Sequence, residues 1–143
     1  MIAKIKRQQS VSAPVTGAKA VAPPGRVLLV EDDRSLRRYL EVVLRREGYE
    51  VMVAVDGLEA MRVTLTQPVD VVVTDAIMPN LNGHELIRFL RNTPQLADMP
   101  VVLLSALATQ DSSNALQQAD ACLSKPVSPK ALVECIENLL EDR

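Results

Sequence analysis

The chain has 143 residues, and 48% of them are hydrophobic, which is enough apolar surface for one globular domain with a buried core. Its net charge of -2 at pH 7 argues against a dedicated nucleic-acid-binding protein, since such proteins carry a clear excess of basic residues. No apolar stretch reaches the roughly 18–20 residues that a membrane-spanning helix requires.

Residues 1–25 differ from the rest of the chain in composition. They hold basic residues and no acid, and Pro14, Pro23 and Pro24 break any regular helix. This composition predicts a flexible, basic, Pro/Ala-rich tail or linker before a single domain over residues 26–143. A transit peptide is the less favoured alternative for this basic, acid-free start.

The two cysteines, Cys122 and Cys135, are too few for a disulfide framework. No secretory hydrophobic segment precedes them. We therefore expect two reduced thiols that fill small gaps in the core of a cytoplasmic protein.

Five short apolar segments alternate with helical patterns after residue 25. Strands are expected at 26–30, 50–54, 69–74, 100–104 and 121–124. Helices are expected at 34–47, 57–66, 84–92, within 110–118 and from 129 to about 141. In the first of these helices, Arg37 falls on the face opposite the apolar residues, and Gly48 is placed to end the helix. The alternation predicts an α/β fold, with a doubly wound five-stranded parallel sheet and helices on both faces.

Chemically active side chains follow the predicted strands directly. In such sheets ligands bind beyond the carboxyl ends of the strands, so these side chains are expected to meet at one edge. Crowded carboxylates repel each other, and a divalent cation removes that conflict; oxygen ligands favour Mg²⁺. A lysine and a hydroxyl beside them suit a phosphoryl group, which an aspartate can accept as an acyl phosphate. The residues concerned are Glu31, Asp32, Asp33, Asp75, Ser105 and Lys125.

A known family shares these motifs in this order. The chain contains VLLVEDD, VDVVVTDAIMPNLNG, VVLLSA and CLSKPV, which resemble the response-regulator receiver domain of two-component signalling. The likeness covers residues 26 to about 142, with 43 residues from Asp32 to Asp75 and 30 from Asp75 to Ser105. It implies a flavodoxin-like fold, similar to the chemotaxis regulators, with strand order 2-1-3-4-5.

The resemblance also implies a role for each site residue. Asp75 is the phosphorylated residue, Lys125 contacts the phosphoryl oxygens and Ser105 is the switch hydroxyl. The implied magnesium ligands are Asp32, Asp75, Glu31 through a bound water, and the backbone carbonyl of Ile77. The peptide bond between Lys125 and Pro126 is expected to be cis. From the residues alone, Asp33 is assigned to capping the first helix.

Several positions depart from the family near its usual output surface. Cys122 stands where the family has Tyr or Phe, and Val127 replaces a frequent Phe. Gln118 replaces a Gly, and the 20 residues from Ser105 to Lys125 make an interval about two residues shorter than usual. A switch through Ser105 and Cys122 therefore lacks the aromatic side chain that the family uses. The sequence does not determine how phosphorylation would be read out.

Two positions bear on the lifetime of a phosphoryl group. Ile77 and Leu107 lie two residues after Asp75 and Ser105, where family side chains flank the path of attacking water. Neither side chain can hold a water by a hydrogen bond. The hypothesis is slow self-dephosphorylation, with a lifetime of minutes or longer.

The sequence thus predicts a phosphoacceptor domain that catalyses only its own phosphorylation and dephosphorylation. The expected partners are a sensor histidine kinase or phosphotransfer protein and an unidentified protein target, without direct contact to nucleic acid or membrane. No DNA-binding segment is expected, so a stand-alone receiver and the receiver of a hybrid histidine kinase both stay open. Assigning His84 as a phosphoacceptor or metal ligand is disfavoured, because no His, Cys or acid lies at ligand spacing from it.

Two other function classes compete with this one. An aspartyl-phosphate phosphatase or phosphotransferase needs a second acid two residues after its nucleophile, and position 77 is Ile. A non-phosphorylated interaction domain would not need the polar residues after the strands, and these are retained together.

Overall fold

The computed structural model describes residues 24–106 and 118–141. The strands are β1 (Arg26–Val30), β2 (Glu50–Ala54), β3 (Val71–Asp75), β4 (Val101–Ser105) and β5 (Ala121–Ser124). The helices are α2 (Arg34–Arg46), α3 (Gly57–Thr66), α4 (Gly83–Asn92) and α6 (Pro129–Glu141), with a short 3-10 helix, η1 (Pro94–Leu96). The strands pair in parallel in the order β2-β1-β3-β4-β5, which confirms the predicted sheet.

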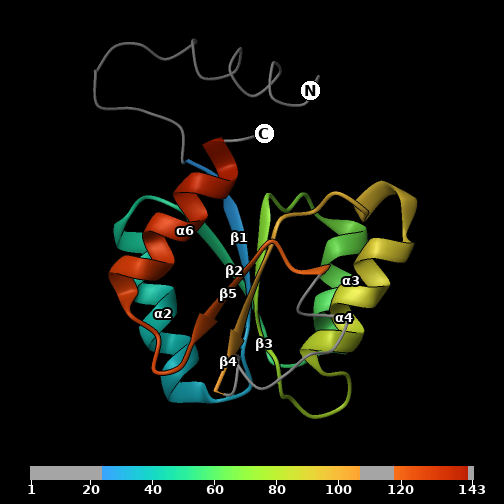
Figure 1. Ribbon diagram of the computed structural model, residues 1–143, viewed down its shortest axis with the longest axis horizontal. Helices are drawn as coiled ribbons and strands as arrows, with labels where there is room; N and C mark the ends of the chain where they lie inside the picture. Colours follow the sequence, from blue (N-terminus) through green and yellow to red (C-terminus); the bar gives the residue numbers. More distant parts are fainter. Residues whose placement is uncertain (1–23, 107–117, 142–143) are drawn as a thin grey trace.

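Helices cover both faces of the sheet, α2 and α6 on one side and α3 and α4 on the other (Figure 1). Successive residues of β1 alternate between the two cores: Leu28 packs toward α3 and α4, and Leu29 toward α2 and α6. Every residue of β3 and β4 is buried, which explains why these segments are apolar runs without a polar face. Each buried Val or Leu side chain of these two strands contributes about 1.5–3 kcal/mol by leaving water.

The ends of α2 are set by residues on either side of it. The Asp33 carboxylate accepts a hydrogen bond from the backbone N–H of Leu36 at 3.1 Å, as expected for a cap. Gly48 has φ 97°, and its N–H donates to the Arg45 carbonyl at 3.0 Å while Tyr49 N–H donates to the Leu44 carbonyl at 3.2 Å. This pair of bonds is a Schellman motif, so Gly48 ends the helix as predicted.

β1, β2, β5, α3 and α6 have the predicted bounds, and β3, β4, α2 and α4 differ from the predictions by one or two residues. β3 begins at Val71 rather than at residue 69, and β4 is shifted by one because Pro100 has no N–H to donate. The expected helix within 110–118 falls almost entirely on residues outside the described ranges, as do the tail over residues 1–23 and Leu107. Within the described ranges, no helix is both long enough and apolar enough to cross a membrane.

Gly83 lets the loop after β3 fold back on the strand. Its N–H donates to the Ala76 carbonyl at 3.0 Å, and a Cβ on Gly83 would lie 2.3 Å from the carbonyl oxygen of Asp75. Only glycine therefore allows α4 to begin this close to the end of β3.

We expect Gly83→Ala to lower the free energy of unfolding by about 1–3 kcal/mol, because the added methyl group must displace the Asp75 backbone. Urea unfolding of both proteins measures the difference. Helix propensity alone predicts the opposite sign, a gain of about 0.5–1 kcal/mol for Ala over Gly inside a helix. A stabilised variant would therefore contradict the close packing described here.

Candidate functional site

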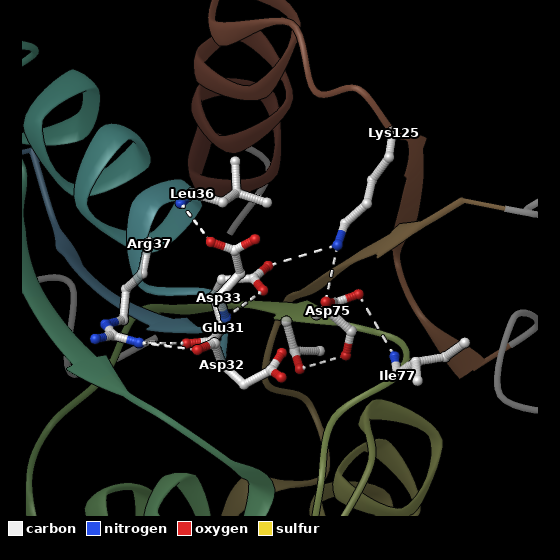
Figure 2. A network of polar contacts seen from close by, with 9 residues as sticks. Glu31, Asp32, Asp33, Leu36, Arg37, Asp75, Ile77 and Lys125 are labelled. Carbon is white, nitrogen blue, oxygen red and sulfur yellow. Dashed lines mark hydrogen bonds and ion pairs between the residues drawn. The ribbon is translucent and has the colours of Figure 1, made fainter.

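The carboxyl ends of four strands bring the predicted site residues to one edge of the sheet (Figure 2). Glu31 directly follows β1, and its N–H donates to the Ala54 carbonyl of β2 at 3.0 Å. Asp75 is the last residue of β3 and is only 6% exposed. Lys125 follows β5, and its N–H donates to the Ser105 carbonyl at the end of β4 at 3.1 Å. Backbone hydrogen bonds between strands therefore hold Glu31 and Lys125 in place at this edge.

Lys125 spans the pocket to reach two acids. Its Nζ lies 2.8 Å from Asp75 Oδ2 and 3.7 Å from Glu31 Oε1. Burial lowers the pKa of Lys125, but the hydrogen bond and the charge of Asp75, with a smaller contribution from Glu31, outweigh it and raise the pKa. The ammonium group is thus held in its charged form and fixed beside Asp75.

Three carboxylates converge beside this lysine. Glu31, Asp32 and Asp75 each offer one oxygen, and these oxygens all lie within 4.8 Å of one another. Glu31 is fully buried, yet its Oε1 has no hydrogen-bond partner. An orphaned buried oxygen within an all-oxygen donor set fits Mg²⁺, which binds through one or two carboxylates and retains waters.

The pKa of Glu31 reflects its burial and the charged groups around it. Burial raises its pKa from 4.5 to about 7; the Asp33 N–H and the charge of Lys125 oppose the rise, and the charge of Asp75 adds to it. At neutral pH and without a cation, Glu31 is therefore divided between its charged and neutral forms.

Arg37 is a site residue that the sequence interpretation placed on the solvent face of its helix. Its Nη1 donates to the backbone carbonyl of Glu31 at 2.9 Å and lies 3.5 Å from the carbonyl oxygen of Asp32 (Figure 2). One guanidinium group thus ties down the loop that carries two of the acids. The signal that could have revealed it is its position in the second turn, one turn beyond the capping Asp33.

The loop after β3 has a second support that sequence reasoning missed. Asn80 has φ 67°, and its Nδ2 donates to Asp56 Oδ2 at 2.6 Å. Hydrogen bonds to Asp56 from the Glu59 N–H first and from Asn80 second lower the pKa of that carboxyl group. The loop that carries Ile77 is thereby joined to the start of α3.

The other candidate residues lie at different distances from the pocket. Ile77 follows Asp75 closely, with its N–H 3.4 Å from Asp75 Oδ1 and its side chain 77% exposed. Cys122 is half-buried in β5 and packs against the core beneath α3 and α4. His84 lies in the first turn of α4 and is not part of the carboxylate group. The Lys125–Pro126 peptide bond is cis, as expected.

Comparison with known proteins identifies the family. Residues 27–137 match the model of the response regulator receiver domain. The chain is 38% identical over 117 residues to "Probable transcriptional regulator ycf27" of Cyanophora paradoxa, an alignment that covers 80% of this chain and 48% of that protein. The chain therefore belongs to the response-regulator receiver domain family, and it spans about half the length of the curated relatives it matches.

Two solved structures extend this comparison. The response regulator TrrA of Thermotoga maritima, in complex with Mg²⁺ and BeF, is 30% identical with a TM-score of 0.74, covering 80% of this chain and 98% of that one. The receiver domain of the sensor histidine kinase PA1611 of Pseudomonas aeruginosa is 28% identical with a TM-score of 0.76, covering 82% and 98%. The PA1611 structure has a magnesium ion coordinated in its active site cleft.

Glu31 gives a pH-dependent prediction for the metal-free protein. Its folded-state pKa of about 7 lies above the ordinary 4.5, so its contribution to stability is complete below pH 4.5 and is lost as the pH rises through about 7. In EDTA at pH 8, we expect Glu31→Gln to be more stable than the wild type by roughly 2–3 kcal/mol. Urea unfolding between pH 4.5 and pH 8 measures both proteins.

The difference between the two proteins should shrink toward zero at the acid end of that range. Adding MgCl₂ at pH 8 should stabilise the wild type more than Glu31→Gln. The charged carboxylate of Glu31 gains a counter-ion, whereas the neutral amide of the variant gains none. A gap that stays constant across the pH range would show that Glu31 is not the titrating group.

Proposed function

We propose that this chain is a phosphoacceptor signalling domain whose Asp75 receives a phosphoryl group from a phosphohistidine. The proposal rests on one observation: Lys125 Nζ lies 2.8 Å from Asp75 Oδ2, within a group of three convergent carboxylates. Membership of the receiver family supports the same reaction.

The proposed reaction is a transfer between two nucleophiles. A carboxylate oxygen of Asp75 forms a bond to phosphorus, the bond from phosphorus to the imidazole nitrogen of the donor breaks, and its electron pair stays on that nitrogen. Asp75 points toward Lys125 at the carboxyl edge of the sheet (Figure 2). Lys125 would exchange its contact with Asp75 for one with a phosphoryl oxygen, keeping its charge beside the new negative group.

The proposed cation site uses the acids that crowd the pocket. Asp32 and Asp75 would hold Mg²⁺ directly, Glu31 through a water, and Ile77 through its backbone carbonyl. A bound Mg²⁺ supplies charge neutralisation for the phosphoryl oxygens and the carboxylates. Ser105 lies at the end of β4 and is 7% exposed, where its hydroxyl would sense the phosphoryl group.

The proposed partners follow from the reaction. A sensor histidine kinase or phosphotransfer protein donates the group, and the change in Asp75 shifts binding of a target protein. Cys122 cannot supply an aromatic ring to this switch, so we propose that readout depends on Ser105 and on the residues around β5. Residues 1–25 are proposed to be a linker.

Acetyl phosphate tests the acceptor directly. With MgCl₂ present, we expect the intact mass of the wild type to rise by the mass of one phosphate. The control variant Asp98→Asn should gain the same mass, because Asp98 is an exposed aspartate outside the site. Asp75→Asn should gain nothing, because an amide is not a nucleophile toward phosphorus. Lys125→Met should be labelled at least about tenfold more slowly, in line with loss of a charge-assisted contact.

Turnover of added phosphate monoesters by the wild type would instead support the phosphatase alternative. Labelling of Asp75→Asn equal to that of the wild type would show that Asp75 is not the acceptor. The wild type gaining no phosphate would support an interaction domain that works without phosphorylation.

Ile77 gives a prediction for the lifetime of the acyl phosphate. Its exposed aliphatic side chain has no group that could orient a water. We expect a half-life of minutes or longer for the wild type, and a half-life at least about threefold shorter for Ile77→Gln, whose amide can hold a water. Release of inorganic phosphate from purified, acetyl-phosphate-labelled protein measures both.

A wild-type half-life of seconds without any phosphatase would refute this proposal. Ile77→Leu is the matched control, since it changes shape without adding a hydrogen-bonding group. Equal half-lives for the Gln and Leu variants would show that hydrogen bonding at this position has no part in the hydrolysis.

A further inference from the structure

A groove runs between the two helices that cover one face of the sheet. α2 and α6 pack side by side (Figure 1), and the groove between them encloses about 450 Å³. Val43 and Val133 contribute apolar side chains to its lining, and Lys130 is the only basic residue of the described part of the chain that lines it. Three acids complete the charged lining: Glu47, Glu134 and Glu137. The groove therefore offers apolar surface together with an excess of negative charge.

The acids of the groove have no partner inside the domain. Within the described part of the chain, the side chains of Glu47, Glu134 and Glu137 are exposed and make no ion pair or hydrogen bond. Burial first, and then the charges of Glu137, Glu47 and Glu141, raise the pKa of Tyr49 to about 12. Like charges gathered around one side chain repel one another, so positive charge placed among them would be stabilised.

The chain enters the domain at one end of this groove. Pro24 is the first described residue, and a Cβ on Gly48 would lie 3.3 Å from its Cδ. A Cβ on Gly25 would lie 3.0 Å from Cδ1 of Leu140, which is in the last turn of α6. The first two described residues therefore lie between the ends of α2 and α6, close to Glu47 of the groove.

The segment before Pro24 carries the charge that the groove lacks. Residues 1–23 hold four of the chain's 16 basic residues and none of its 18 acids. Three of these four basic residues lie in the first seven residues, MIAKIKR, which also contain Ile2 and Ile5. A segment of basic and apolar residues is complementary to apolar surface bordered by acids.

The length of the connection suits a contact within one chain. Residues 8–23 separate the basic segment from Pro24, and 16 residues without regular structure have a root-mean-square span of about 20–24 Å. The 13 residues of α6 extend over about 20 Å. A tether whose span matches the distance between two sites gives an effective concentration of about the millimolar range, so even a weak contact would be populated.

We propose that residues 1–7 dock in the groove between α2 and α6 of their own chain. The basic side chains of this segment pair with the glutamates of the groove, and its two isoleucines cover Val43 and Val133. Residues 8–23 remain the linker. The contact does not depend on the proposed phosphorylation of Asp75, because none of the residues that line the groove belongs to the carboxylate pocket.

Zero-length crosslinking of the full chain tests this contact. A carbodiimide joins a lysine amine to a carboxylate only where the two groups touch, and peptide mass spectrometry identifies each joined pair. At about 0.1 M NaCl we expect the two lysines of residues 1–7 to crosslink to the groove glutamates at least about fivefold more than to Glu85 and Asp98, two exposed acids outside the groove. At about 1 M NaCl, where the Debye length is about 3 Å, this preference should nearly vanish.

An equal mixture of isotope-labelled and unlabelled chains distinguishes the possible occupants. We expect crosslinks within single chains. Crosslinks that form only between labelled and unlabelled chains would show that a second copy fills the groove, and would overturn the proposal. Crosslinks spread evenly over the groove, Glu85 and Asp98 would overturn it as well. So would the absence of crosslinks from Lys4 and Lys6, with or without a crosslink from Lys19.

Two matched variants locate the effect. Glu137→Lys reverses one exposed charge of the groove and should lower crosslinking to the remaining groove glutamates by at least about threefold. Asp98→Lys makes the same change in net charge outside the groove and should leave this crosslinking unchanged. An equal loss in both variants would assign the effect to net charge and overturn the proposal. Labelling of Asp75 by acetyl phosphate should be the same in both variants, so failure of the docking proposal and failure of the proposed function are measured separately.

Discussion

Two acids at the end of neighbouring strands share one lysine, and the rest of the site depends on that unequal charge balance. Lys125 contacts Asp75 at 2.8 Å and Glu31 at 3.7 Å, so one positive charge faces two buried carboxyl groups and a third, exposed one at Asp32. Burial is the main cause of the raised pKa of Glu31, and the charge of Asp75 adds to it. The pocket is therefore built to gain positive charge, and its oxygen ligands restrict that charge to a hard cation.

The parallel sheet imposes this crowding. The strand register pairs Val30 with Thr74 and Asp75 with Leu104. Glu31, which follows β1, and Asp75, which ends β3, therefore lie at the same level of the sheet. Tight backbone approaches then fix the loops around them: Gly83 lies against the carbonyl of Asp75, and Asn80 is joined to Asp56. The acids cannot separate to relieve their repulsion without breaking ladder bonds or these loop contacts, so a bound cation is the route open to them.

The sequence was sufficient for the elements whose signals are local. Buried parallel strands are apolar runs, and Asp33 and Gly48 mark the two ends of α2, so the elements and their layers were predicted correctly. The strand order, also correct, was implied by the resemblance to the receiver family. Contacts between different elements could not be predicted from the sequence. Arg37 was assigned to the solvent face from periodicity alone, because helical spacing cannot show that a long side chain bends back to two backbone carbonyls. The link from Asn80 to Asp56 spans 24 residues and has no sequence signature of its own.

Arg37 and Arg38 are neighbours in α2, but they lie in different surroundings. Arg37 faces inward and holds the backbone of the acidic loop, which adds order without neutralising the carboxylates. Arg38, the next residue, is turned by about 100° to the exposed side, where it meets no acid within the described domain. Arg37 therefore supports the acidic loop through its backbone carbonyls, and the three converging carboxylates keep their oxygens for a cation.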